Sequence, residues 1–215
     1  VLIIPSRPVT GDVSYRASGN LSVVQLPTND GEDISLRAGA SLVVVSELDV
    51  DPTGTVTVSA GQSLTLGGTV RAASLVVEQA GDDLSLTTAV STLSVNLLGA
   101  GSDFTLQQAG NLRISSLAMQ GGNISIEVDG ALTIGGTTVA SAGRVSLSVL
   151  QGSVTATLRA TDLDVNARGA ITINEFDALN ISLLDSDSGG SVSVTAGGAL
   201  LVDAAVHAVG ASTVS

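Results

Sequence analysis

The sequence contains no cysteine, no lysine and no tryptophan. The absence of cysteine excludes disulfides and is compatible with a bacterial extracellular protein as well as with a cytosolic one. The absence of lysine excludes a P-loop, a Schiff-base lysine and a pyridoxal-phosphate site. The net charge is −12, and such an acidic surface repels phosphate backbones, so we expect no nucleic-acid binding.

Aromatic residues make up only 1% of the chain, although 44% of it is hydrophobic. Valine, leucine, alanine and isoleucine supply the apolar side chains, which suits a narrow interior of stacked aliphatic residues better than a generic β-sheet core. No run of about 18 apolar residues occurs, so we expect no membrane insertion.

Histidine is almost absent too. A Ser-His-Asp triad would have to use His207 with Asp203 near it in sequence, but the chain has no G-x-S-x-G elbow. A zinc site needs several histidines or cysteines, so zinc is not indicated either.

Short apolar triplets separated by glycine turns are what the chain has in abundance. The segment 121–149 contains Ile124-Ser125-Ile126, Leu132-Thr133-Ile134 and Val145-Ser146-Leu147, each introduced by glycine and one further residue. Alternation of apolar and small polar residues predicts short strands with one buried face. No apolar stripe of helical period is present, so we expect no helices.

These triplets recur at a longer period along the chain. The first apolar residues of matching strands are Ile34, Val56, Leu84, Phe104, Ile124, Val145, Ile171 and Val192. Most of the intervals are 20 to 22 residues, which predicts an all-β parallel β-solenoid with three faces per coil. The two longer intervals predict loops that bulge from the rod near 71–81 and 156–168.

The domain organisation predicted is one solenoid. Residues 1–28 form an entry segment and an irregular first coil, and residues 29–215 form the solenoid. No polar cap follows the last repeat, and an open solenoid end exposes unpaired backbone groups. We therefore expect the solenoid to continue beyond residue 215 or to stack on other copies. The apolar start Val1, Leu2, Ile3 and Ile4 either covers the first coil or adds as a strand to another molecule.

Acidic turns are the candidate metal sites. Asp-x-Asp next to glycine is a reasonable start for a calcium site, which points to Asp49, Asp51, Asp185 and Asp187. The calcium-binding nonapeptide repeat GGxGxDxUx is not met, and Asp, Ser and Gly are ordinary turn residues, so solvated turns are the alternative. Apart from calcium, no cofactor is expected.

Paired carboxylates keep a carbohydrate-active β-helix enzyme open as an alternative. Asp162 with Asp164 is one such pair, but glycoside hydrolysis needs a defined separation between the two groups. A sugar-cleaving groove usually needs aromatic platforms and a basic residue, and the chain has no tryptophan and no lysine for these roles. We therefore expect no enzymatic activity.

The motifs GGN-ISI, GA-LTI-GG and SAGR-VSL resemble the repeat of filamentous-haemagglutinin-like bacterial exoproteins, over roughly residues 31–206. The resemblance implies a right-handed β-helix in an extracellular, cell-surface protein with a structural or adhesive role. It implies as partners flanking repeats, other copies, or a cell-surface glycan or protein. A self-assembling filament subunit, joined by its ends or by residues 1–4, is the second function that the sequence leaves open.

Overall fold

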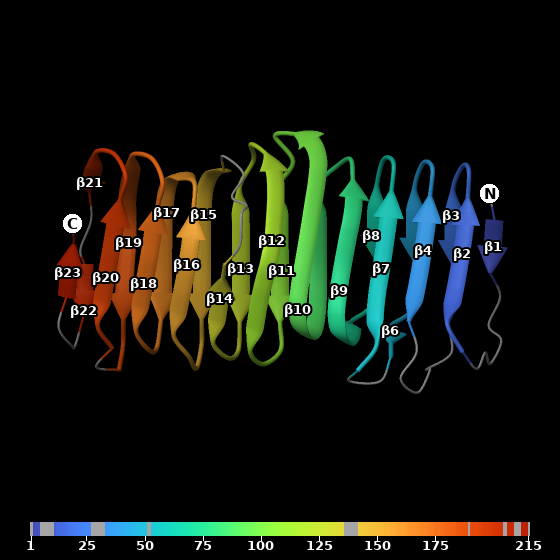
Figure 1. Ribbon diagram of the computed structural model, residues 1–215, viewed down its shortest axis with the longest axis horizontal. Helices are drawn as coiled ribbons and strands as arrows, with labels where there is room; N and C mark the ends of the chain where they lie inside the picture. Colours follow the sequence, from blue (N-terminus) through green and yellow to red (C-terminus); the bar gives the residue numbers. More distant parts are fainter. Residues whose placement is uncertain are drawn as a thin grey trace.

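The computed structural model describes residues 2–4, 11–26, 33–50, 53–135, 142–188, 190–203, 206–208 and 212–214. These residues form strands and turns without any helix, and the strands stack along a rod with the two chain ends at its opposite ends (Figure 1). Strands on the near side run upward and those behind run downward as the chain advances along the rod (Figure 1). The coil is therefore right-handed, and the predicted β-solenoid is confirmed.

Strands of successive coils pair in parallel and make three faces, since each face receives an equivalent segment from every coil. The first face consists of β2 (Val13–Ala17), β4 (Ile34–Ala38), β7 (Thr55–Ala60), β12 (Leu112–Gln120), β14 (Leu132–Ile134), β16 (Val154–Leu158), β18 (Ile171–Glu175), β20 (Val192–Ala196), β23 (Ser212–Val214) and parts of the long strands β9 (Val70–Ala80) and β10 (Leu84–Ala100).

The second face begins with a four-stranded sheet that continues onto β10 through contacts with β8. It consists of β1 (Leu2–Ile4), β3 (Leu21–Val23), β5 (Leu42–Val44), β8 (Leu64–Leu66), the start of β10, β11 (Phe104–Gln108), β13 (Ile124–Val128), β15 (Ala142–Val149), β17 (Ala160–Ala167), β19 (Leu179–Ser186) and β21 (Leu200–Val202). The third face consists of β6 (Leu48–Asp49), the start of β9, the ends of the second-face strands and β22 (Val206–Ala208).

The core is a set of aliphatic rows, in which each residue lies on its equivalent from the coil before. All members of the first-face row are at most 4% exposed. This row is Val13, Ile34, Val56, Leu75, Leu93, Ile114, Ile134, Ala156, Ile173 and Val194. The period-two alternation places the small polar residues between them on the outside, as the triplets predict.

The two predicted bulging loops are wrong. Val56 lies on Leu75 rather than on Leu84, the residue that the sequence pattern matched with it, and residues 71–80 belong to strand β9. Val145 lies on Leu163, so the chain at 156–168 belongs almost entirely to β16 and β17. The physical reason is that all three faces use the same apolar–polar–apolar triplet, so the sequence of a triplet does not indicate to which face it belongs. Along the first-face row the coil length is 17 to 22 residues.

One glycine shows how closely the turns stack. Gly122 has φ of 82°, in the left-handed region, and a Cβ atom there would lie 2.0 Å from the carbonyl oxygen of Ser102 in the preceding coil. Only glycine fits such a position, because the backbone of the neighbouring coil occupies the space of a side chain.

Candidate functional site

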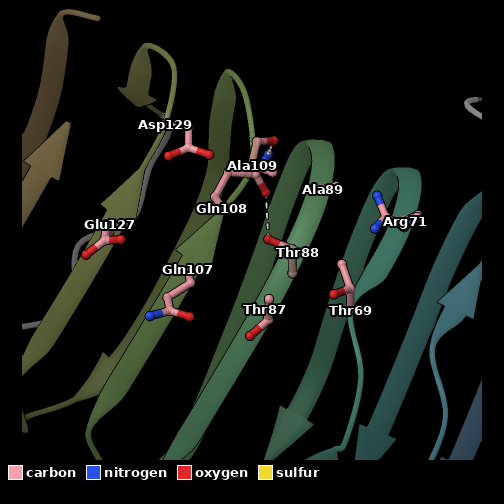
Figure 2. A pocket seen from close by; sticks show the side chains of 10 residues that line it. All are labelled: Thr69, Arg71, Thr87, Thr88, Ala89, Gln107, Gln108, Ala109, Glu127 and Asp129. Atoms are coloured by element: carbon pink, nitrogen blue, oxygen red, sulfur yellow. Dashed lines mark hydrogen bonds between the residues drawn. The ribbon is translucent and has the colours of Figure 1, made fainter. Parts of the chain in front are cut away.

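A polar notch of about 280 Å³ opens along one corner of the rod, where four consecutive coils pass. We call it the corner notch (Figure 2). Its lining comes from β10, β11 and β13 and from the segment around the start of β9: Thr69, Arg71, Thr87, Thr88, Ala89, Gln107, Gln108, Ala109, Glu127 and Asp129.

The notch exists because of two alanines in the corner row. Arg71 pairs with Ala89 in the next coil, and backbone hydrogen bonds carry the row on through Ala109 to Asp129. Two successive coils thus have a methyl group where the flanking coils have a long guanidinium or a carboxylate. The gap spans three strand spacings from Arg71 to Asp129, roughly 14 Å.

The floor of the notch is a buried polar pair. Thr88 and Gln108 are 1% and 4% exposed and lie next to each other in one interior row. In the next two coils the equivalent residues of this row are Val128 and Val149. The Thr88 hydroxyl donates to Gln108 Oε1 at 2.6 Å, and Gln108 Nε2 donates to the Val90 carbonyl at 2.8 Å. Because its amide is already used inside the rod, Gln108 shapes the notch rather than binding a ligand in it.

The rim, in contrast, offers free polar groups. Thr87, Gln107 and Glu127 stack in register on adjacent coils, and all three are exposed. Within the described part of the chain, their side chains and those of Arg71 and Asp129 make no hydrogen bond and no ion pair with other residues. Figure 2 shows the cation at one end of the notch and both carboxylates at the other. A ligand could therefore meet a positive end, a neutral middle and a negative end.

The predicted calcium ligands fall at distant places along the rod. Asp49 ends β6 and is in register with Arg71 of β9 in the next coil, without an ion pair between the two side chains, while Asp51 lies outside the described residues. Asp185 and Asp187 lie near the other end. Their carboxylates and the imidazole of His207 offer ligand atoms within 4.8 Å of one another, and His207 Nδ1 is 2.8 Å from Asp185 Oδ1.

No predicted metal site included His207, although its spacing of 22 residues from Asp185 is one coil length. The histidine and Asp185 occupy matching positions on β22 and β19. Calcium binding by Asp185 and Asp187 stays a prediction.

The predicted assembly segment forms strand β1. Leu2, Ile3 and Ile4 pair in parallel with β3 of the same chain, in line with the second face, and Val1 lies outside the described residues. At the other end of that face, Leu201 and Val202 of β21 are 57% and 41% exposed.

The carboxylate pair considered for catalysis belongs to a polar network on β15, β17 and β19. Arg144 donates through Nε to Asp164 at 2.7 Å, and Asn180 Nδ2 donates to Asp162 at 2.8 Å. Each carboxylate is thus engaged by a neighbouring coil, on an outward face rather than in the corner notch.

One further carboxylate, Glu175, is buried at 5% exposure. It accepts hydrogen bonds from the backbone N–H groups of Ala160, Phe176 and Asp177. Desolvation nevertheless dominates and raises the pKa of Glu175 above its usual value of 4.5, with a smaller raising contribution from the nearby charge of Asp177.

Comparison with known proteins identifies no relative. No protein-family model, no curated protein and no solved structure matches the chain.

Among the described residues no helix has the length and apolar character needed to cross a membrane. The corner notch was not predicted from the sequence, because the segment that carries Arg71 was assigned to a loop.

Proposed function

We propose that this chain is a non-enzymatic structural and adhesive β-solenoid of an extracellular bacterial surface or filament protein. In this role the rod sets a distance and a stiffness, and its corners present side chains to a partner. The corner notch is the place where a cell-surface glycan binds.

The observation that carries the proposal is the unbroken stacking of the first face. The first-face row runs from Val13 to Val194 without a polar member, and the outward positions between are mostly serine and threonine. Stacked coils that contact only their neighbours make a stiff one-dimensional structure, because every coil buries its apolar row against the next. Because such stacking extends over nearly the whole length of the rod, the structure suits a mechanical role.

The test is to locate the chain and to measure its shape. Antibodies raised against the purified chain should label intact bacteria that make the protein, and electron microscopy of the chain should show straight rods of constant width. Labelling that appears only after the cells are permeabilised would contradict the proposal. Flexible or globular particles would contradict the mechanical role.

A filament subunit is the second candidate, supported by the exposed apolar end of the second face. Val202, which is 41% exposed, pairs with Ile181, which is buried. A strand of another copy could bury Val202 by continuing the parallel pairing. Electron microscopy over a range of concentrations should then show filaments of solenoid width, and Val202→Asp should shorten or remove them.

A carbohydrate-active enzyme is the third candidate, and it draws support from the corner notch, where Glu127 and Asp129 lie together. Two carboxylates that flank a sugar are the usual equipment of a glycosidase. Release of reducing ends from polysaccharides by the purified chain, abolished in Glu127→Gln, would favour the enzyme over the adhesin.

A further inference from the structure

The geometry of the corner notch points to a specific ligand class: we infer that it binds a short oligosaccharide carrying one acidic sugar among neutral ones. The carboxylate of the acidic sugar pairs with Arg71, and the hydroxyls of the neutral sugars bind Gln107, Glu127 and Asp129. This inference rests on the proposed adhesive function and names the partner of that site.

The free groups of the rim select this chemistry. The Arg71 guanidinium donates in a planar fork that matches a carboxylate, and it has no ion-pair partner among the described residues. Glu127 and Asp129 only accept hydrogen bonds, whereas Thr87 and Gln107 both donate and accept. Sugar hydroxyls do both as well, so they can satisfy the carboxylate end and the neutral middle.

The walls argue against an apolar peptide. Apart from the methyl groups of Ala89 and Ala109, the side chains at the rim are polar, and the notch contains no aromatic or large aliphatic residue. The corner backbone is also occupied, since Ala109 N donates to Thr88 O and Asp129 N donates to Gln108 O. A peptide would find neither an apolar anchor nor a free strand edge.

The charge distribution limits the number of acidic sugars to one. The chain carries a net charge of −12, and the far end of the notch is itself acidic. A polyanionic glycan would place carboxylates or sulfates against Glu127 and Asp129, which is repulsive. A single acidic sugar at the Arg71 end, with neutral sugars beyond it, avoids that contact and fixes the direction in which the chain of sugars lies.

The experiment compares two oligosaccharides that differ in one group. The first probe is a tetrasaccharide with a terminal glucuronic acid, and the second is the same molecule with its carboxylate reduced to a primary alcohol. Binding is measured by NMR titration at about 0.15 M salt, where the Debye length is about 8 Å and the distant charges of the rod are largely screened. Arg71→Gln is the test variant.

Arg113→Gln is the matched control, because Arg113 is also exposed but lies on the first face, between Thr92 and Thr133. We expect the acidic probe to bind the native chain about tenfold more tightly than the reduced probe, as one charge-assisted contact would give. Arg71→Gln should remove this preference, Arg113→Gln should keep it, and Asp129→Asn should weaken both probes alike.

Three results would overturn the inference: neither probe binds, Arg71→Gln leaves the preference intact, or Arg113→Gln lowers it as much as Arg71→Gln does. Any of them leaves the rod shape and the surface labelling untouched. Failure of the labelling or of the rod shape, with binding intact, would instead contradict the proposed function alone.

Discussion

Gln108 offers the sharpest test of how the interior of this solenoid is held together. Its side chain is buried and uses both ends of its amide: Oε1 accepts from Thr88 and, at 3.3 Å, from the backbone N–H of Val90, and Nε2 donates to the Val90 carbonyl. The neighbouring coil has valine at the matching position, Val128. The substitution Gln108→Val therefore keeps a residue that this row already accepts and removes only the polar contacts.

The expected cost follows from the groups left behind. Val90 is 3% exposed, so its N–H and C=O would lose their partner in a place where water does not replace it readily. An unsatisfied buried polar group costs about 1–3 kcal/mol, and the hydrogen bond to the Val90 N–H is long. We expect Gln108→Val to lower the free energy of unfolding by about 3 kcal/mol.

Urea unfolding followed by far-UV circular dichroism measures that change, and Gln107→Val is its matched control. Gln107 is the preceding residue, exposed and without a side-chain hydrogen bond in the described chain, so its substitution should stay within about 0.5 kcal/mol. Because solenoids can unfold in parts, hydrogen exchange of the Val90 amide provides a local readout. Equal stability of the two variants, or an unchanged exchange rate of that amide, would refute the reasoning.

Three further predictions concern the core, the buried acid and the acidic turn. Phe104→Ala should lower the free energy of unfolding by about 3–5 kcal/mol, because Phe104 is fully buried. Phe176 is 55% exposed, so Phe176→Ala should change that free energy by less than about 0.5 kcal/mol. Equal losses of stability in urea unfolding would contradict the assignment of the core. Burial raises the pKa of Glu175, so the protonated side chain contributes its full stabilisation below pH 4.5 and loses it as the pH rises through the raised pKa. The melting temperature of Glu175→Gln should therefore depend less on pH than that of the native chain, and parallel curves for the two proteins would contradict this prediction. If Asp185 and Asp187 bind calcium, millimolar calcium should raise the melting temperature of the native chain and not that of Asp185→Asn. A melting temperature of the native chain that calcium leaves unchanged rules the site out. A zinc titration of the native chain and of His207→Ala reports whether the imidazole is one of the ligands.

The fold was predictable from the sequence because alternation and glycine turns act locally. A triplet such as Ile124-Ser125-Ile126 specifies a strand with one buried face wherever it occurs, and its repetition specifies a solenoid. The assignment of triplets to faces was not predictable, since Val56 has two equally suitable partners in the next coil, Leu75 and Leu84. Only the backbone path decides between them, and it selects Leu75.

The corner notch was out of reach of the sequence for the same reason. Its residues are separated by whole coils, so Arg71 and Asp129 become neighbours of one gap only once every intervening coil is assigned correctly. The incorrect prediction of a loop at 71–81 leaves Arg71 outside the row. Conversely, the spacing from Asp185 to His207 equals one coil length, so the sequence does contain a signal for this pair.

A solenoid shows its specific surface where a row is interrupted. A row of equivalent residues serves stacking, and a coil that departs from its neighbours loses some of that stacking, so a departure needs another reason. Two departures coincide at the corner notch: alanines replace long side chains at Ala89 and Ala109, and a polar pair replaces aliphatic residues beneath them. The inner departure supports the corner backbone, because Gln108 binds both polar groups of Val90. The outer departure leaves the charged side chains of Arg71, Glu127 and Asp129 without hydrogen-bond or ion-pair partners among the described residues, which supports the proposed ligand site.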